Sequence, residues 1–288
     1  MVKFSIATPN DIDSLIKLWS LCFSDDPEYL NRLSKHIFER SKTYIATDEN
    51  RVISSLSVFY TSYFSVSGNT IPGGYLYGVC THPQYRGQHL SSSLLHYAKT
   101  DLVADGLEFL ITRPAEESLF GLYEKIGFNS ALYLSKTIVE IGESFGSIKS
   151  ESSQVLLASD FYSMRENYLK KNLVPHIIWS AEMLEYITSD IISNNGFALK
   201  IGEKYCIGYP EEEKDHIITL EHTFNEQISD LFPYLKSIYP QIKSLTSFRP
   251  SNTSDISKEK MYLAISLTQN HIAKRLAKES CYFNFPME

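Results

Sequence analysis

The feature that most constrains this chain is a change of hydrophobic period between residues 73 and 112. Residues 73–80 are rich in Tyr and predict a strand, whereas the apolar residues that follow recur at helical spacing, at Leu90, Leu94, Tyr97, Ala98 and Leu102. Gly106 predicts the end of that helix, and residues 107–112 form an apolar run of strand length. A strand, a helix and a strand in this order predict two parallel neighbouring strands joined by a crossover helix.

The flanking sequence predicts more strands and helices around this core. Strand-like and helix-like patterns occur at residues 2–7 (strand), 12–19 and 27–38 (helices), 43–47 and 52–63 (strands), 118–125 (helix) and 128–139 (strand). The two strands before residue 73 form a meander, which is antiparallel, whereas the next pair is parallel. We therefore expect an α/β (α+β) fold with a mixed sheet.

The length of 288 residues fits about two domains. Residues 142–153 are rich in Gly, Ser and charge and predict a linker, so we expect one domain over residues 1–143 and another over 154–288. The second half loosely repeats the order of the first, with helices at 160–171 and 180–189, strands at 196–201, 204–209 and 216–224, a helix at 226–239, and then mixed sequence.

Composition narrows the class of protein. The net charge is −7, so a basic nucleic-acid-binding face is not expected, and cationic small molecules are mildly favoured as partners. The four cysteines are far apart and make no CxxC pair, which fits a reduced, cytoplasmic setting. The residues after Met1 form no signal-peptide-like apolar region, and no run of about 18 apolar residues exists, so we expect no membrane span.

No metal site is expected. His82, His89 and His96 are spaced by seven, but His82 precedes Pro83 and lies outside the predicted helix. The sequence also has no HExxH pattern and no G-x-S-x-G nucleophile elbow.

The junction between the strand at 73–80 and the following helix carries the most chemical information. Free N–H groups and the positive dipole end of a helix bind anions, Gly87 permits close backbone approach, and Arg86 adds a forked cation. Together they suit a pyrophosphate. The alternative at this point is an ordinary N-capped helix with no ligand.

The same stretch resembles the acyl-CoA motif of GNAT N-acetyltransferases, in which the pattern R/Q-x-x-G-x-G/A falls here on Arg86, His89 and Ser91. The resemblance implies acetyl-CoA as the co-substrate, with its pantetheine arm along the strand at Val79 and Thr81. It implies a binding set of Val79, Cys80, Thr81, Arg86, Gly87, Gln88, His89, Leu90 and Ser91. His89 departs from the pattern, since the family usually has Gly there. This side chain either assists or weakens CoA binding.

A second match lies downstream, where residues 122–128 resemble the family's Tyr-x-x-x-Gly-Phe signature. The resemblance implies that Tyr123 is the general acid that protonates the leaving thiolate. Phenols and thiols have reference pKa values of about 10 and 8.5, which suits that exchange. The alternative is that Tyr123, one of 19 tyrosines, only packs in the core.

The resemblance covers about residues 3–140, and the extra half resembles that of tandem-GNAT proteins related to the enhanced-intracellular-survival acetyltransferases. It implies a degenerate second GNAT-like domain. No Arg-x-x-Gly loop follows the strand predicted at 217–224, where Glu226 and Gln227 stand instead, and an acid there would repel phosphate, so we expect that this half binds no CoA. It also implies that Phe23, Asp25 and Asp26 border the acceptor, although a core aromatic beside a capped helix is an equal alternative.

The predicted function is transfer of an acetyl group from acetyl-CoA to a primary amine of a small molecule or peptide by direct attack. The alternative, motivated by His89, is a non-catalytic acyl-CoA or small-ligand sensor on the same fold. A third possibility, peptidyl transfer from aminoacyl-tRNA, is disfavoured by the acidic charge balance.

Overall fold

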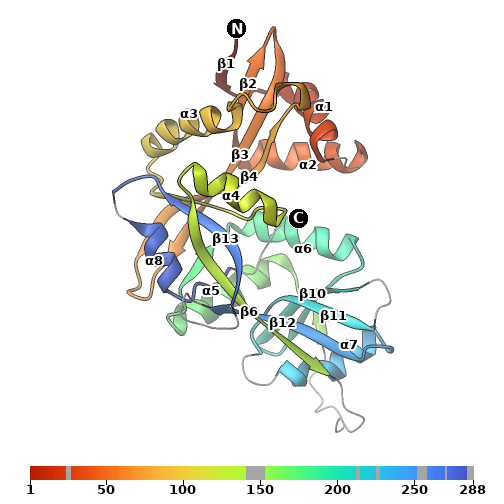
Figure 1. Cartoon of the computed structure of the whole chain (residues 1–288). Coiled ribbons are helices and arrows are strands. Elements are labelled where there is room, and N and C mark those ends of the chain that lie inside the picture. Colours follow the sequence, from red (N-terminus) through yellow and green to blue (C-terminus); the bar gives the residue numbers. More distant parts are fainter. Residues whose placement is uncertain are drawn as a thin grey trace. The chain divides into compact units, whose positions relative to one another are not determined.

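The computed structural model describes residues 1–23, 27–140, 153–211, 215–224, 228–251, 258–269 and 271–283. The chain divides into two units, whose elements are labelled in Figure 1. The first unit comprises Met1–Ser62, Ile71–Ala131 and Tyr262–Arg275, and the second comprises Tyr63–Thr70, Leu132–Met261 and Leu276–Glu288. None of the helices in these described ranges has the length and apolar character needed to cross a lipid bilayer.

The first unit contains most of the predicted N-terminal elements. In chain order they are β1 (Lys3–Ile6), η1 (Pro9–Asp11), α1 (Ile12–Phe23), α2 (Pro27–Arg40), β2 (Ser41–Asp48), β3 (Arg51–Phe64), β4 (Thr70–Thr81), η2 (Pro83–Tyr85), α3 (Leu90–Ala104), β5 (Phe109–Thr112) and α4 (Glu117–Lys125), followed much later by β13 (Lys258–Ser266) and α8 (Ile272–Lys278). Their sheet runs β1-β2-β3-β4-β5-β13. β4 and β5 are parallel while β1 with β2 and β2 with β3 are antiparallel, which confirms the predicted mixed sheet.

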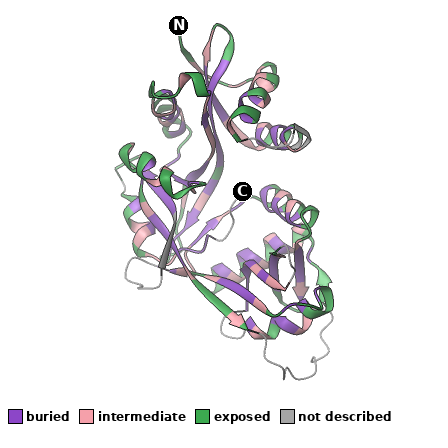
Figure 2. Ribbon diagram, turned by 45° about the vertical axis from the view of Figure 1, so that its right-hand side comes forward, coloured by how far each residue is buried: buried purple, intermediate pink, exposed green. Residues whose placement is uncertain are grey.

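Helices cover both faces of this sheet. Because successive side chains of a strand point to opposite faces, one strand can contact helices on both sides. On β3, Ser55 Oγ accepts a hydrogen bond from Trp19 Nε1 of α1 at 3.0 Å. The next residue, Leu56, packs on the opposite face in a buried cluster with Leu94 and Leu95 of α3. Figure 1 shows α1 and α2 on one side of these strands and α3 on the other, and Figure 2 shows the strands buried between them.

Two glycines let β4 approach its neighbours closely. A Cβ atom on Gly73 would lie 2.2 Å from the ring of Phe109, and one on Gly74 would lie 2.5 Å from Val58. Larger residues would push β4 away from β5 and β3. The β4–β5 pairing at Gly73 and Gly74 therefore requires the absence of side chains.

The second unit repeats the order of elements. It contains β6 (Asn129–Glu140), β7 (Ser153–Val155), α5 (Ala158–Lys171), β8 (His176–Ile178), α6 (Ala181–Ser193), β9 (Phe197–Ile201), β10 (Lys204–Pro210), β11 (His216–His222), η3 (Ile228–Leu231), α7 (Phe232–Ile238) and β12 (Ser244–Ser251). Its sheet runs β6-β12-β11-β10-β9-β7, with β11 and β12 parallel. A strand, two helices, a meander, a crossover and a parallel strand thus recur, so the chain has a second GNAT-like region.

Each sheet ends in a strand from the other half of the sequence. β6 follows α4 along the chain, yet residues 133–140 of β6 pair with β12. β13 follows β12 along the chain, yet residues 263–266 pair with β5. The two units therefore do not result from dividing the chain at one place between residues 143 and 154. The division into domains 1–143 and 154–288 stays a prediction about independent folding.

Three elements lie in the stretch that sequence patterns left as mixed, namely β12, β13 and α8. β12 contains three serines and Pro250, so local propensity gives little strand signal, and pairing with β6 and β11 supplies the strand geometry instead. The expected helix at 226–239 is shorter, since η3 and α7 span 228–238 and residues 226–227 lie outside the described ranges. The expected linker also lies outside them, except for Ser153, which begins β7.

Candidate active site

The loop from β4 to α3 has the backbone geometry of an anion cradle. Gly87 and His89 both have positive φ, 79° and 58°, and no heavy atom lies within 4 Å of a Cβ built on Gly87. The first hydrogen bond inside α3 runs from Ser93 N–H to His89 C=O, at 3.0 Å. The N–H groups of residues 90–92 therefore have no partner within the helix, and they lie at its positive dipole end.

His89 has a positive φ although it is not a glycine, and its side chain points to solvent rather than filling the loop between β4 and α3. Its backbone is in the left-handed region that glycine prefers, at a cost of roughly 1 kcal/mol for a residue with a side chain. The side chain is exposed, and it makes no capping hydrogen bond at the start of α3. The loop thus has the conformation that a glycine would adopt, and the departure from the family pattern lies in the side chain alone.

Arg86 stands at the entrance to this loop. Its Nε donates to the carbonyl oxygen of Thr81, the last residue of β4, at 3.3 Å, and its side chain is exposed. The guanidinium is therefore held at the end of β4, in the loop that leads to α3. Arg86, Gly87, Gln88 and His89 are all exposed, while Leu90 is buried and anchors the helix.

β4 and β5 part after a short parallel pairing. The pairing covers Gly73–Tyr75 against Phe109–Ile111, whereas β4 continues to Thr81. Thr112 Oγ1 donates to Leu76 C=O at 3.0 Å and closes the paired end. Gly78, with φ of 59°, then bends the strand. The edge of β4 beyond Leu76 includes Val79 and Thr81, the two residues predicted to pair with a pantetheine arm.

The side chains of the predicted β4 residues point in different directions. Val79 is half-buried against the α3 cluster, while Cys80 is buried on the α1 side with its Sγ 3.3 Å from Ser55 Oγ. Thr81 Oγ1 lies 2.9 Å from Ser54 Oγ. The Cys80 thiol therefore packs away from α3, so only its backbone can serve the predicted pairing.

The Tyr-x-x-x-Gly-Phe segment forms the C-terminal cap of α4. Gly127, with φ of 99°, donates its N–H to Glu124 C=O, and Phe128 N–H donates to Tyr123 C=O, each at 3.1 Å. This is the Schellman pattern, which usually brings the first and last residues into apolar contact. Here the rings of Tyr123 and Phe128 meet edge to face with centroids 5.4 Å apart. The spacing of the signature therefore fixes the orientation of Tyr123.

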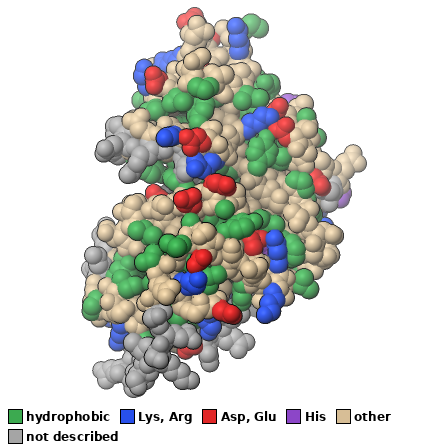
Figure 3. All heavy atoms as spheres, turned by 180° about the vertical axis from the view of Figure 1, so that it is seen from behind, with side chains coloured by type: hydrophobic (Ala, Val, Ile, Leu, Met, Phe, Trp, Pro, Cys, Tyr) green, Lys and Arg blue, Asp and Glu red, His purple; other side chains and the backbone are tan. Residues whose placement is uncertain are grey.

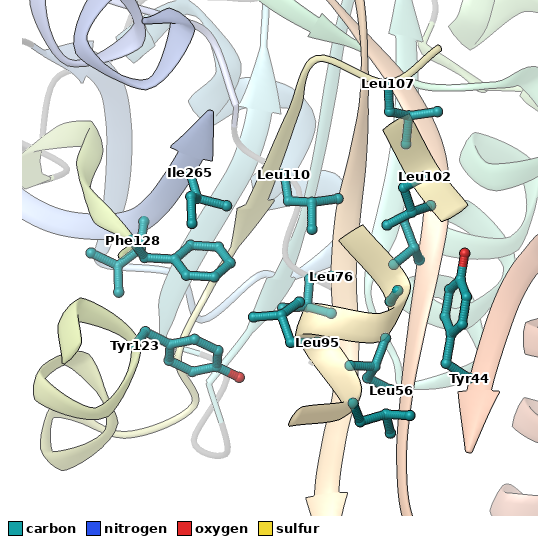
Figure 4. Close-up of a cluster of buried hydrophobic side chains, with 14 residues drawn as sticks. Tyr44, Leu56, Leu76, Leu95, Leu102, Leu107, Leu110, Tyr123, Phe128 and Ile265 are labelled. Atoms are coloured by element: carbon teal, nitrogen blue, oxygen red, sulfur yellow. The ribbon is translucent and has the colours of Figure 1, made fainter. Parts of the chain in front are cut away.

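Tyr123 is 9 % exposed and reaches from α4 toward Leu76 and Leu95, with its hydroxyl leading, as Figure 4 shows. Burial raises the pKa of Tyr123 to about 12, against the opposing effect of a hydrogen bond with Thr112. The phenol therefore stays protonated at neutral pH. Thr112, which affects this pKa, also closes the β4–β5 pair, so the phenol lies near the point where the two strands part.

The remaining predicted residues differ in what the structure records. Phe23 is the last residue of α1 and is 42 % exposed. Asp25 and Asp26 lie outside the described residues. Two residues that sequence reasoning missed take part in the site, Thr112 and Cys22, whose Sγ lies 3.5 Å from Thr81 C=O. The strand end at Thr112 was a usable signal, whereas nothing near Cys22 in the sequence pointed to β4.

The first unit has the mixed-sheet fold that is found in GNAT acyltransferases, as comparison with known proteins shows. Residues 3–131 match the family model described as acetyltransferase (GNAT) domain. Over these residues, which are somewhat less than half of the chain, the protein is similar to GNAT acetyltransferase domains.

Solved structures share the fold over nearly the whole chain. A probable N-acyltransferase from Enterococcus faecalis V583 aligns with a TM-score of 0.74 at 13 % identity, over 93 % of this chain and 72 % of that one. Eis1 from Mycobacterium abscessus aligns with a TM-score of 0.67 at 8 % identity, over 93 % and 74 %. A tandem GNAT protein from the clavulanic acid biosynthesis pathway aligns with a TM-score of 0.54 at 8 % identity, over 94 % and 100 %.

Proposed function

We propose that this protein is an N-acetyltransferase that moves the acetyl group of acetyl-CoA to a primary amine of a small molecule or peptide. The observation that carries the proposal is the β4–α3 junction. There a guanidinium, two positive-φ residues and the free amides of a helix start converge beside an unpaired strand edge. The GNAT domain match over residues 3–131 supports the same assignment.

The pyrophosphate belongs at this junction. Amides at a helix start bind anions without a dedicated cation, and Arg86 adds a charge-assisted, forked donor set. Arg86 must release Thr81 C=O in part to reach a phosphate, which costs one exposed hydrogen bond at 3.3 Å. In the same proposal Val79 and Thr81 pair with the pantetheine amides, Cys80 contributes backbone only, and Gln88, Leu90 and Ser91 contribute through the loop and the first turn of α3.

Tyr123 belongs at the thioester. As the amine forms the new C–N bond, the C–S bond breaks and negative charge collects on sulfur. A phenol with a pKa of about 12 is a weaker acid than an ordinary thiol, whose reference value is about 8.5. Tyr123 therefore stabilises the leaving sulfur by donating a hydrogen bond that strengthens as charge develops, rather than by complete proton transfer.

The surface charges fit a small acceptor better than a polyanion. On the face in Figure 3, the described Lys and Arg side chains lie interspersed with Asp and Glu rather than gathered together. The net charge of −7 points the same way. Phe23, exposed at the end of α1, is the described residue that we assign to the acceptor side.

We further infer a tandem-GNAT chain related to the enhanced-intracellular-survival acetyltransferases, with a second unit that binds no CoA. The repeated order of elements and the alignment with Eis1 and with a tandem GNAT protein support this relation.

The test is acetyl transfer itself. Purified protein is incubated with acetyl-CoA and a panel of primary amines and peptides, and free CoA and acetylated amine are quantified by chromatography and mass spectrometry. We expect equal amounts of both products, dependent on the amine. CoA binding with no product across the panel would instead favour the non-catalytic sensor, and absence of CoA binding would contradict both.

A further inference from the structure

Two thiols meet beside the predicted phosphate loop. Cys22, in the last turn of α1, is half-buried, and its Sγ lies 3.5 Å from the carbonyl oxygen of Thr81. That oxygen also accepts the Arg86 Nε hydrogen bond at 3.3 Å. The Cys22 thiol and the Arg86 guanidinium are therefore held at one acceptor atom, and the Arg86 guanidinium helps to lower the pKa of Cys22.

The second thiol belongs to the residue next to Thr81. Cys80 is buried, and its Sγ lies 3.3 Å from Ser55 Oγ, which in turn accepts from Trp19 Nε1 at 3.0 Å. Cys22 and Cys80 also each shift the pKa of the other thiol, and Cys22 Sγ contacts Thr81, the residue next to Cys80. Packing thus holds the two sulfur atoms near each other, between the end of α1 and the end of β4.

The two thiols are chemically unequal. Hydrogen bonding from Cys80, together with Arg86, lowers the pKa of Cys22 to about 7 despite partial burial. Burial raises the pKa of Cys80. At neutral pH a larger share of Cys22 is therefore thiolate than the few per cent found for an ordinary cysteine. An accessible thiolate beside a protonated second thiol is the arrangement typical of redox-sensitive cysteines.

We propose that Cys22 and Cys80 form a redox-active dithiol, in which Cys22 reacts with a peroxide and Cys80 resolves the product as an intramolecular disulfide. In the first step the Cys22 thiolate attacks one peroxide oxygen, the O–O bond breaks, and hydroxide leaves. This gives a sulfenic acid on Cys22. In the second step the Cys80 sulfur attacks the Cys22 sulfur, the S–O bond breaks, and water leaves with the Cys80 proton. The dithiol loses two electrons, and hydrogen peroxide is reduced to two waters.

This chemistry is coupled to the proposed CoA site through Arg86, and this coupling rests on the proposed function. A pyrophosphate and the Cys22 thiolate compete for the same guanidinium. CoA binding therefore raises the pKa of Cys22 and slows its reaction with peroxide, and by reciprocity the thiolate weakens CoA binding.

The primary experiment treats the full ligand-free chain with hydrogen peroxide at pH 7, blocks free thiols with iodoacetamide, and maps peptides by mass spectrometry without reduction. We expect a linked pair of peptides carrying Cys22 and Cys80. Cys206 and Cys281, both buried with raised pKa, should be recovered as thiols and serve as internal controls. Persistence of free Cys22 and Cys80 after peroxide treatment, or oxidation of Cys206 and Cys281 to the same extent, would overturn the proposal.

A matched variant separates the two steps. In Cys80→Ser the sulfenic acid on Cys22 should accumulate and be trapped by dimedone, whereas the wild type should show little trapping. Equal trapping in both proteins would mean that Cys80 does not resolve Cys22.

The roles of Arg86 and CoA are read from alkylation rates. In the wild type the rate of Cys22 alkylation should rise with pH with a midpoint near 7, and Arg86→Ala should move that midpoint toward about 8.5. CoA should slow alkylation at pH 7. If calorimetry shows CoA bound but alkylation is unaffected, the coupling is wrong. If calorimetry shows no binding, the proposed function fails, and the dithiol is judged on the ligand-free reaction alone.

Discussion

In the described part of the chain, the parallel pairs β4–β5 and β11–β12 have the same topology but different ends. In the first unit, the pairing of β4 with β5 stops at Tyr75, and β4 continues to Thr81 with its edge turned toward the parted β5. In the second unit, pairing of β11 with β12 stops at Thr219, and β11 continues to His222. The two units differ in which groups hydrogen-bond the backbone of β4 or β11 beyond its last paired residue.

In the second unit, side chains of the same unit hydrogen-bond the end of β11. The Tyr282 hydroxyl accepts a hydrogen bond from His222 N–H at 3.3 Å and donates to His222 C=O at 3.1 Å. The His222 side chain adds two more links, since its Nε2 lies 2.8 Å from Ser247 Oγ of β12 and its Nδ1 accepts from Phe224 N–H at 3.2 Å. A strand edge already satisfied from within the chain is not open to a ligand.

Buried charges reinforce the same end of the second unit. Arg165 and Glu221 are both fully buried, with Arg165 Nε 2.9 Å from Glu221 Oε1, and Tyr205 O–H donates to the same carboxylate oxygen at 2.6 Å. Removing one partner of such a pair leaves an uncompensated charge, at a cost of about 3–5 kcal/mol. The comparison teaches that one topology leaves either an open strand edge or a locked framework, depending on the side chains at the strand ends.

The largest expected effect is the pH dependence of the stability of the second unit, which tests the end of β11 at His222. Burial lowers the pKa of His222 from its ordinary value of 6.5 to about 4, so the folded state binds fewer protons than the unfolded state in that interval. Stability is thus fully present above pH 6.5 and falls by about 3 kcal/mol as pH drops toward 4. Urea unfolding of the Trp19→Phe protein, followed by Trp179 fluorescence, measures this loss in the second unit. His222→Gln should remove most of the pH dependence, and an unchanged slope would contradict the assignment.

The next effect concerns catalysis in the first unit. Tyr123→Phe keeps the ring contact with Phe128 but removes the donor, so kcat should fall about 100-fold while acetyl-CoA affinity changes by less than about twofold. Tyr97→Phe, on the exposed side of α3, is the matched control and should leave kcat unchanged. Steady-state kinetics with a saturating amine measures both. Undiminished turnover in Tyr123→Phe would leave Tyr123 as a packing residue.

The third effect is a loss of CoA affinity, which we expect to be smaller and to occur only for a change in the first unit. Arg86→Ala should weaken CoA binding by about tenfold to a hundredfold, since a hydrogen bond to a charged group contributes about 1.5–3 kcal/mol. Lys204→Ala, which removes an exposed cation from β10 of the second unit, should have no effect on CoA binding. Isothermal titration calorimetry measures both constants. Equal losses in the two variants would show that general charge, rather than the β4–α3 loop, determines binding.

The smallest effect concerns His89. Because its backbone already has a left-handed conformation, His89→Gly should change stability by less than about 1 kcal/mol and retain CoA binding. His89→Val should destabilise more, because a β-branched residue is strained at positive φ. Thermal melts with and without CoA distinguish the two. Loss of CoA binding in His89→Gly would mean that the imidazole itself contacts the ligand.

Sequence patterns predicted what depends on neighbours along the chain. The strand–helix–strand core and the cap at Gly127 and Phe128 follow from local periodicity and spacing. The exchange of β6 and β13 does not, because partners more than 100 residues apart leave no periodic trace. Tyr282 and Cys22 were missed for the same reason, since each acts on a strand distant in sequence. His89 lies between these two cases. The sequence showed that it stands where the family usually has Gly, but only the structure showed that its backbone still has the conformation of a glycine.

The central claim is that CoA binds once per chain, at the β4–α3 junction of the first unit. Calorimetric titration of CoA into the wild-type chain, with molar ratio determined independently by equilibrium dialysis, tests this directly. We expect one site per chain, and we expect Arg86→Ala to weaken CoA binding there. Two sites per chain, or one site indifferent to Arg86, would contradict it.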